Sequence, residues 1–391
     1  MVLAIRIVGV RLVFKRSLPL QYGLGNALLF ASVVALTLGG WLIWLVLVAV
    51  YVIGGPIDET VDDSFGGPGT SARWFCDVNL FLTLPLITLL TIVFLRSLVS
   101  DDPVGIHGIL GTSTDAFRLQ SLDSRIDIAA AIFLVGSCYA MFGATVAHEL
   151  THRTGNSIAQ LSARGLLALM FNTSFSIFHI HGHHRYVGTY RDPATARRGE
   201  SIFAFTLRTM HGQLVDAYRH EAARLRLSGK SPFGWHNRFI SGQFLSLATV
   251  VASAEIAGAT GILGLLSAAL IGRTLHEFVN YIQHFGLIRI EGAPVAARHT
   301  WDSYRTLSNA LHYNLPRHSD HHMFAAKPYW ELRSAPQAPV LPHGYLTMVL
   351  IALLPFAWQR VMAPRLADWD QRFANDDERA VVRQRGWENL C

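Results

Sequence analysis

Charged residues and cysteines are both scarce in this chain of 391 residues. Asp, Glu, Lys and Arg make up 15% of it, against about a quarter in a soluble domain, and 51% is hydrophobic. The three cysteines, Cys76, Cys138 and Cys391, include no C-x-x-C pair. Their spacing excludes a disulfide framework, a zinc ribbon and a fused rubredoxin-like iron site. The composition is typical of a polytopic membrane protein.

Apolar runs predict an all-α fold with about six transmembrane helices, because one helix of about 20 residues spans a bilayer. The run at 18–53 is interrupted by Gly39-Gly40, which predicts two spans joined by a tight turn. Residues 54–78 are predicted to form a polar loop. Further spans are predicted at 79–95, 126–146, 239–257 and 261–282. Shorter apolar stretches predict a buried or interfacial helix at 157–178 and a re-entrant or interfacial helix at 345–358.

Arginines are concentrated at 185–238 and basic residues also occur near the N-terminus. Cytoplasmic loops carry the excess of Lys and Arg, so both segments are predicted to face the cytoplasm from a bacterial inner membrane. An even number of spans must then separate them, which favours two helices in 18–53. We expect one membrane-embedded domain over residues 1–391. Its expected parts are transmembrane helices in 18–147 and 239–283, and a cytoplasmic, histidine-rich catalytic cap in 148–238 and 284–391.

Histidine is abundant, with 18 copies, and three of them lie in the five residues HSDHH at 318–322. Residues three or four apart on a helix face the same way, so this cluster can present three imidazoles together. The pairs His148/His152 and His179/His183 have the same four-residue spacing. Four clusters near the ends of the fourth and sixth spans supply nine candidate metal ligands: His148, His152, His179, His183, His184, His284, His318, His321 and His322.

Neutral imidazole binds iron, zinc, copper and nickel. Nine imidazoles exceed the roughly six ligands of one iron ion or four of one zinc ion. Two metal ions with four or five imidazoles each therefore fit the count. The nearby carboxylates Glu149 and Asp320 are predicted to support the ligands through hydrogen bonds. His181 and His312 are not predicted to be ligands.

Four sequence blocks resemble the integral-membrane non-haem di-iron hydroxylases and desaturases. They are HELTHR from His148, HIHGHHRYVGT from His179, NYIQHFGL from Asn280 and LPRHSDHH from Leu315. The third block is most similar to the alkane 1-monooxygenase and xylene monooxygenase branch of the fatty acid desaturase-hydroxylase superfamily. The resemblance implies that the nine histidines hold two Fe ions. It also implies hydroxylation of an apolar hydrocarbon with dioxygen, and no catalytic residue beyond the ligands.

Departures from the alkane enzymes leave the substrate open. Phe178 and Gln283 stand where those enzymes commonly have glutamate. Gln283 is more similar to the aryl-methyl monooxygenases, whereas Arg317 before HSDHH resembles the alkane enzymes. The resemblance implies a terminal or benzylic C–H bond as the target. Because no iron–sulfur or rubredoxin motif is present, electrons are expected from a separate rubredoxin or ferredoxin and its reductase, with the arginine-rich surface as a docking face.

Three other functions fit the sequence less well. An intramembrane zinc protease fits HELTH, with Glu149 as the general base, but leaves most of the clustered histidines unexplained. A desaturase would share the metal site, and the NYIQHFGL block argues against it. A metal transporter would need polar groups within the spans, which are scarce here. Nothing in the sequence indicates nucleic-acid binding, so the expected partners are the electron donor, the hydrocarbon and membrane lipid.

Overall fold

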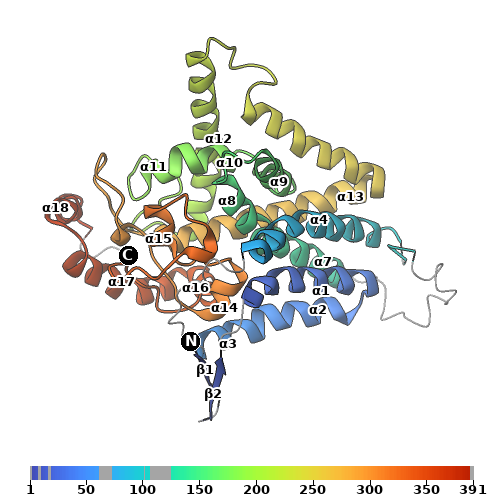
Figure 1. The fold of residues 1–391 in the computed structure, drawn as a ribbon, viewed down its shortest axis with the longest axis horizontal. Coiled ribbons are helices and arrows are strands. Elements are labelled where there is room, and N and C mark those ends of the chain that lie inside the picture. Colours follow the sequence, from blue (N-terminus) through green and yellow to red (C-terminus); the bar gives the residue numbers. More distant parts are fainter. Residues whose placement is uncertain are drawn as a thin grey trace.

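The computed structural model describes residues 2–7, 10–15, 19–60, 73–100, 102–105 and 125–387. Figure 1 shows long helices lying side by side, with a group of short helices and loops gathered at one end of them. The described elements are helical apart from a two-stranded antiparallel hairpin, β1 (Val2–Ile7) and β2 (Val10–Lys15). The all-α prediction is therefore confirmed.

Five helices in the described part of the chain are long and apolar enough to cross a membrane, which identifies a multi-pass membrane protein. They cover Gln21–Leu38, Trp41–Thr60, Arg73–Ser97, Arg125–Thr151 and Arg238–His284. The first two meet at Gly39 and Gly40, whose φ angles are 73° and 61°. Glycine adopts such positive angles without a Cβ penalty, so the predicted tight turn is confirmed.

The fifth helix, α13 (Arg238–His284), accounts for two of the six predicted spans. Its 47 residues are interrupted by non-helical backbone at Ala257 (φ −143°) and Gly258 (φ 58°). The chain bends sharply there, as Figure 1 shows. The break falls between the predicted spans at 239–257 and 261–282. The two predicted spans therefore correspond to the two halves of α13, and the helix count differs only because α13 is counted once.

The polar loop predicted at 54–78 is wrong at both of its ends. Residues Gly55–Thr60 form α3, and the next helix already begins at Arg73; residues 61–72 lie outside the described part. Asp58, which lies in α3, anchors this polar segment to the rest of the protein. Its carboxylate accepts hydrogen bonds from the backbone N–H groups of Leu307 (2.8 Å) and Ser308 (3.0 Å). These donors lie at the start of a distant helix, so Asp58 caps it from outside the local sequence.

The spans are built from several consecutive elements. These are η1 (Pro19–Gly23), α1 (Leu24–Leu38), α2 (Trp41–Leu47), η2 (Val48–Gly54), α3, α4 (Arg73–Ser97), α7 (Arg125–Cys138), η4 (Tyr139–Ala144), α8 (Thr145–Thr151) and α13. The segments η2 and η4 are π-helical. Such wide turns are frequent at functional sites, and η4 lies directly before the helix that carries His148.

The remaining described elements range from single turns to one helix of 26 residues. They are α9 (Ser157–Ala168), α10 (Phe175–Phe178), η5 (His179–His183), α11 (His184–Tyr186), α12 (Ile202–Leu227), η6 (Ala297–His299), α14 (Thr306–Leu311), α15 (His318–Met323), η7 (Tyr329–Glu331), α16 (Tyr345–Ala352), α17 (Pro355–Arg372) and α18 (Asp376–Gln384). The helix predicted at 157–178 is thus broken near Phe171, which has a φ of 54°. The stretch predicted at 345–358 contains α16 and the start of α17.

Small residues hold α7 against α13. A Cβ on Gly136 would lie 2.7 Å from the Cβ of Ile271 and 2.8 Å from the carbonyl oxygen of Ala268. A Cβ on Gly272 would lie 2.9 Å from that of Tyr139. Such close backbone contact is typical of membrane helices with small residues at the interface. It fixes the helices that lead to His148 and His284 relative to each other.

Candidate metal centre

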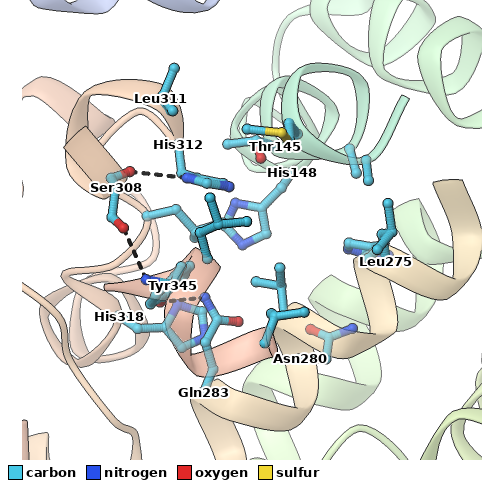
Figure 2. A pocket seen from close by; sticks show the side chains of 18 of the residues that line it. Thr145, His148, Leu275, Asn280, Gln283, Ser308, Leu311, His312, His318 and Tyr345 are labelled. Carbon is cyan, nitrogen blue, oxygen red and sulfur yellow. Dashed lines mark hydrogen bonds between the residues drawn. The ribbon is translucent and has the colours of Figure 1, made fainter. Parts of the chain in front are cut away.

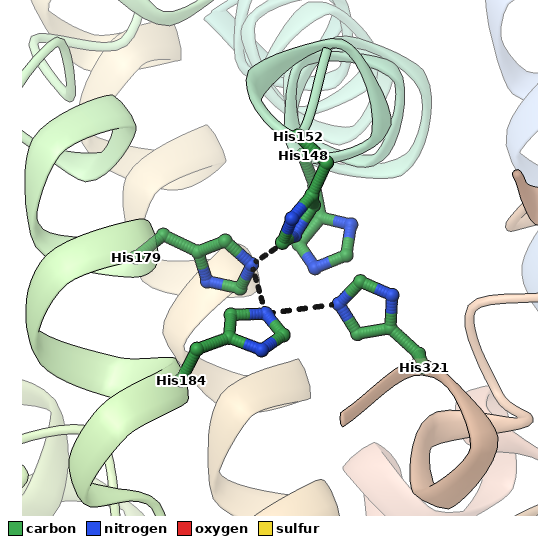
Figure 3. Close-up of side chains that lie close together, drawn as sticks. All are labelled: His148, His152, His179, His184 and His321. Atoms are coloured by element: carbon green, nitrogen blue, oxygen red, sulfur yellow. Dashed lines mark hydrogen bonds between the residues drawn. The ribbon is translucent and has the colours of Figure 1, made fainter. Parts of the chain in front are cut away.

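The nine predicted ligands come together at one end of the bundle and form two groups. The first group contains His148, His152, His179, His184 and His321. The second group contains His183, His284, His318 and His322. Within each group one ring nitrogen per residue lies within 4.8 Å of all the others. Figure 3 shows the five imidazoles of the first group converging from three separate segments of the chain.

A π-helical turn decides which group receives each histidine of the second sequence block. The backbone N–H of His184 donates to the carbonyl oxygen of His179, five residues earlier, within η5 and α11. His184 therefore stands one full turn above His179, and both imidazoles enter the first group. His183 is rotated away and enters the second group.

Helix α15 divides its histidines in the same way. His318 and His322, four residues apart, belong to the second group, whereas His321 belongs to the first. Asp302 fixes the start of this helix, since its Oδ1 accepts a hydrogen bond of 2.7 Å from the backbone N–H of Ser319. The adjacent Trp301 donates from Nε1 to the carbonyl oxygen of Phe285 at 2.9 Å. The Trp301-Asp302 segment thus joins the end of α13 to α15.

The spacing of the ring nitrogens fits two metal ions. The Nε2 atoms of successive histidines are 2.9 to 3.1 Å apart along His152–His179–His184–His321 and 3.0 Å apart along His284–His318–His322. Metal–nitrogen bonds of about 2.1 Å place neighbouring ligands about 3.0 Å apart at right angles and about 3.4 Å apart in a tetrahedron. The observed spacing is therefore compatible with imidazoles that share one metal ion in each group.

Hydrogen bonds between imidazoles cannot account for these contacts. Each ring nitrogen carries at most one proton, so His179 cannot exchange separate hydrogen bonds with His152 and His184 while His184 also bonds to His321. In addition, the Nε2 atom of His148 is buried without a hydrogen-bond partner. Buried ring nitrogens at this spacing are a donor set able to bind a metal ion.

Six of the nine histidines are held in their neutral, metal-binding form. Burial and the neighbouring imidazoles lower the pKa of five of them well below its usual value: His179, His184, His318, His321 and His322. Burial also lowers the pKa of His152 to about 3. Because metal ions bind unprotonated imidazole, this environment favours binding at neutral pH.

Within the described part of the chain, Asp192 is a carboxylate that contacts a candidate ligand, and the sequence did not predict it. His183 donates from Nδ1 to Oδ2 of Asp192 at 2.8 Å, and Asp192 is 1% exposed. Glu149 instead pairs with Arg153 at 3.4 Å, and Asp320 accepts from Lys327 at 2.7 Å. The sequence offers one indication of this contact, which is the presence of an acidic residue nine positions after His183. Loop geometry, which spacing does not reveal, turns it back toward the imidazole.

A largely apolar cavity leads to both histidine groups. It encloses about 1000 Å³ of empty space, its open mouth included, and reaches His148 and His179 of the first group and His183 and His318 of the second. Figure 2 shows His148 and His318, one from each group, at its wall. Its apolar wall comes from several helices and includes Val50, Ala140, Met141, Ala144, Leu275, Val279, Leu307, Leu311, Leu346 and Val349. The cavity suits an apolar molecule with one end next to the imidazoles.

One side of the cavity is polar. Gln283 donates from Nε2 to the hydroxyl oxygen of Tyr345 at 2.9 Å, and both residues line the cavity. His312 and Ser308 lie nearby, as Figure 2 shows, with the Nδ1 of His312 3.0 Å from the carbonyl oxygen of Ser308. Gln283 is thus part of the cavity wall, so its departure from the alkane enzymes bears on what the cavity accepts.

Comparison with known proteins places the chain in a family. The fatty acid desaturase family matches residues 127–352, and the chain belongs to it. The chain is 37% identical to alkane 1-monooxygenase 1 of Pseudomonas aeruginosa over 240 residues, which cover 60% of the chain and 63% of that relative. The match thus covers less than two thirds of that relative's length.

Two longer matches extend the comparison. Alkane 1-monooxygenase 1 of Alcanivorax borkumensis is 30% identical over 84% of this chain and 80% of its own length. The xylene/toluene monooxygenase hydroxylase component of Pseudomonas putida is 27% identical over 95% of this chain and 96% of its own length. The expected resemblance to the desaturase-hydroxylase superfamily is therefore confirmed, and the chain is a multi-pass membrane member of the fatty acid desaturase family with two histidine groups able to bind metal.

Proposed function

We propose that this protein is a membrane di-iron monooxygenase that hydroxylates a terminal or benzylic C–H bond of an apolar hydrocarbon, with alkane 1-monooxygenase as the nearest activity. The observation that carries the proposal is the apolar cavity, which ends at imidazoles of both histidine groups. A hydrocarbon from the bilayer would fill it with its reacting carbon next to the metal site. The names of the relatives support the same substrate class.

Five histidines of the first group and four of the second would hold two Fe ions. When bound, iron supplies the reductive activation of dioxygen, which protein side chains do not perform. The chain's own contribution is positional. The apolar wall orients the hydrocarbon and excludes water, and the Trp301-Asp302 segment and Asp192 hold the ligand imidazoles in place.

Electrons would come from a rubredoxin or ferredoxin with its reductase, at the cytoplasmic face of a bacterial inner membrane. Arg185, Arg191 and Arg197 are exposed and follow closely after the ligand candidates His183 and His184. A positive surface beside the metal site would steer a small acidic carrier to it. In this proposal, residues 148–238 and 284–391 form the cytoplasmic catalytic cap that carries the histidines and receives the electron carrier.

An aryl-methyl substrate is the second candidate. It is favoured by Gln283 in the cavity wall and by the match to the xylene/toluene monooxygenase component over 95% of the chain. The zinc protease is disfavoured, because Glu149 pairs with Arg153 and three further imidazoles surround His148 and His152.

Product analysis under ¹⁸O₂ tests the proposal. The purified, iron-loaded protein with a rubredoxin and reductase is given octane and, separately, p-xylene. We expect an alcohol that carries one ¹⁸O atom, and the better substrate distinguishes the alkane from the aryl-methyl activity. An unlabelled alkene would identify a desaturase instead and overturn the proposal.

A further inference from the structure

His312 is a polar residue of the cavity that the metal centre does not use. It directly follows α14 and lines the cavity that reaches both histidine groups, yet it belongs to neither group. The residue is 8% exposed. Leu307, Leu311 and Leu315, which flank it in the sequence, line the same cavity. A hydrogen-bonding group therefore stands among apolar side chains at this wall.

The backbone fixes which ring nitrogen of His312 faces the cavity. Nδ1 lies 3.0 Å from the carbonyl oxygen of Ser308, and the backbone N–H of His312 donates to the same oxygen at 3.1 Å. A carbonyl oxygen can only accept, so Nδ1 carries the ring hydrogen. Figure 2 shows Nδ1 turned toward Ser308 and the second ring nitrogen, Nε2, on the opposite side of the ring. Nε2 is therefore the atom that His312 presents to an occupant of the cavity.

This Nε2 atom is an acceptor that lacks a donor. Burial lowers the pKa of His312 to about 4, so the ring is neutral and Nε2 carries no hydrogen at neutral pH. Among the described residues, none donates a hydrogen bond to Nε2; the neighbouring ring of Tyr345 is 5.7 Å away between centroids, and its hydroxyl pairs with Gln283. Unlike Nε2 of His148, the atom is not sealed inside the protein. It is open to a molecule in the cavity.

The cavity and this acceptor together define the chemistry of a ligand. A pure hydrocarbon would cover Nε2 and leave it without a partner, which costs the hydration of the atom and returns nothing. A carboxylate offers no hydrogen, and an ammonium group would lose its hydration among apolar side chains. A hydroxyl group is neutral and supplies the missing hydrogen. The ligand that satisfies both parts of the site is thus an apolar alcohol.

We propose that His312 is a ligand-binding residue whose Nε2 accepts a hydrogen bond from the hydroxyl group of an apolar alcohol in the cavity. The proposal deepens the proposed function and rests on it for the origin of the alcohol. That alcohol is either the product of hydroxylation or a substrate that already carries a hydroxyl group away from the reacting carbon. A site built to bond a hydroxyl group discriminates against the analogue that lacks it.

Binding of 1-octanol and of nonane, which has a methyl group in place of the hydroxyl, tests the site. Both probes are measured on the iron-loaded protein in detergent without an electron donor, so no turnover occurs. His312→Asn can still donate to the carbonyl oxygen of Ser308 but has no acceptor at the position of Nε2. We expect it to weaken 1-octanol about 3- to 10-fold relative to nonane. An equal change for both probes would refute the proposal.

Three further variants separate the hydrogen bond from the shape of the cavity. His312→Gln can place its amide oxygen where Nε2 stands and should keep the preference of the wild type. His312→Phe also removes the acceptor and replaces His312→Asn if that variant fails to fold. The matched control is Leu307→Ala, which enlarges the same cavity on the same helix and should change both probes by one factor. A selective loss of 1-octanol in this control would overturn the role of His312.

Turnover of octane by the protein with its electron donor distinguishes the two sources of the alcohol. Competition by added 1-octanol that is not itself consumed identifies the product as the ligand. Conversion of 1-octanol to 1,8-octanediol identifies a substrate that carries a hydroxyl group. Neither competition nor conversion, in protein that hydroxylates octane, would contradict the proposal. The binding measurement needs no turnover, so a failure of the proposed reaction is distinguishable from a failure of this site.

Discussion

Replacing Asp192 with asparagine is expected to weaken one metal position and spare the other. Oδ2 of Asp192 accepts from His183 at 2.8 Å and from the hydroxyl of Thr195 at 2.7 Å, and Oδ1 accepts from the backbone N–H of Ala194 at 3.0 Å. Asparagine has one acceptor oxygen in place of two and carries no charge. It therefore cannot keep the hydrogen bonds to both His183 and Ala194.

The size of the effect follows from that lost hydrogen bond. A hydrogen bond to a charged partner contributes about 1.5–3 kcal/mol, which corresponds to roughly 10- to 100-fold in affinity. Loss of a partner that orients a metal-binding imidazole has effects of about the same size. His183 belongs to the second group, so that group should weaken by this factor and the first should not change.

The assay is metal content after equilibration with iron buffered by a chelator. At a free-iron level that just saturates the wild type, the variant should hold about one iron per chain in place of two. Asp216→Asn is the matched control, because Asp216 pairs with His220, which is not a ligand candidate, at 3.3 Å. If Asp192→Asn binds both ions as tightly as the wild type, the assigned role of Asp192 is refuted.

Three further substitutions test other parts of the structure. Gly136→Ala places a Cβ 2.7 Å from Ile271 and should lower stability by about 1–3 kcal/mol in thermal unfolding, whereas Gly155→Ala, with open space around it, should not. Ala144→Phe should fill the cavity and lower the rate of hydroxylation at least about tenfold while the iron content stays unchanged. A loss of iron in this variant would contradict the explanation that the substrate is blocked from the cavity. Burial would raise the pKa of Glu378, but hydrogen bonds from His299 and Arg298 hold it at about 2. The resulting stabilisation is present above about pH 4.3 and lost as the pH falls toward 2, so the melting temperature of Glu378→Gln should fall less between pH 6 and pH 3 than that of the wild type.

The sequence predicted the spans well because the bilayer imposes a simple rule on them. Apolar length and Gly39-Gly40 were sufficient for the first hairpin, and the break at Gly258 lies between two predicted helices. Apolar length does not predict where the spans end, because tertiary contacts determine how far each helix continues. Asp58 appeared to belong to a loop, yet it lies in a helix because it caps α14, about 250 residues away.

The histidines were predicted as a set that holds two metal ions with four or five imidazoles each, but which histidine joins which group was not predicted. Spacing on an ideal α-helix pairs His179 with His183, whereas the π turn at η5 pairs His179 with His184. Asp192 was missed for a related reason, since its position depends on how a loop folds back. Residue spacing predicts only local geometry. The division of the histidines between the two groups and the position of Asp192 depend on packing between segments, so spacing could not predict them.

Counting metal ions in the purified protein tests the central claim most directly. We expect about two irons per chain, with about one lost in His318→Ala, which affects the second group, and about one lost in His321→Ala, which affects the first. Hydroxylation should be abolished in both variants. One zinc per chain, unchanged in His318→Ala and lost in His148→Ala, would contradict the di-iron account and favour the zinc protease instead.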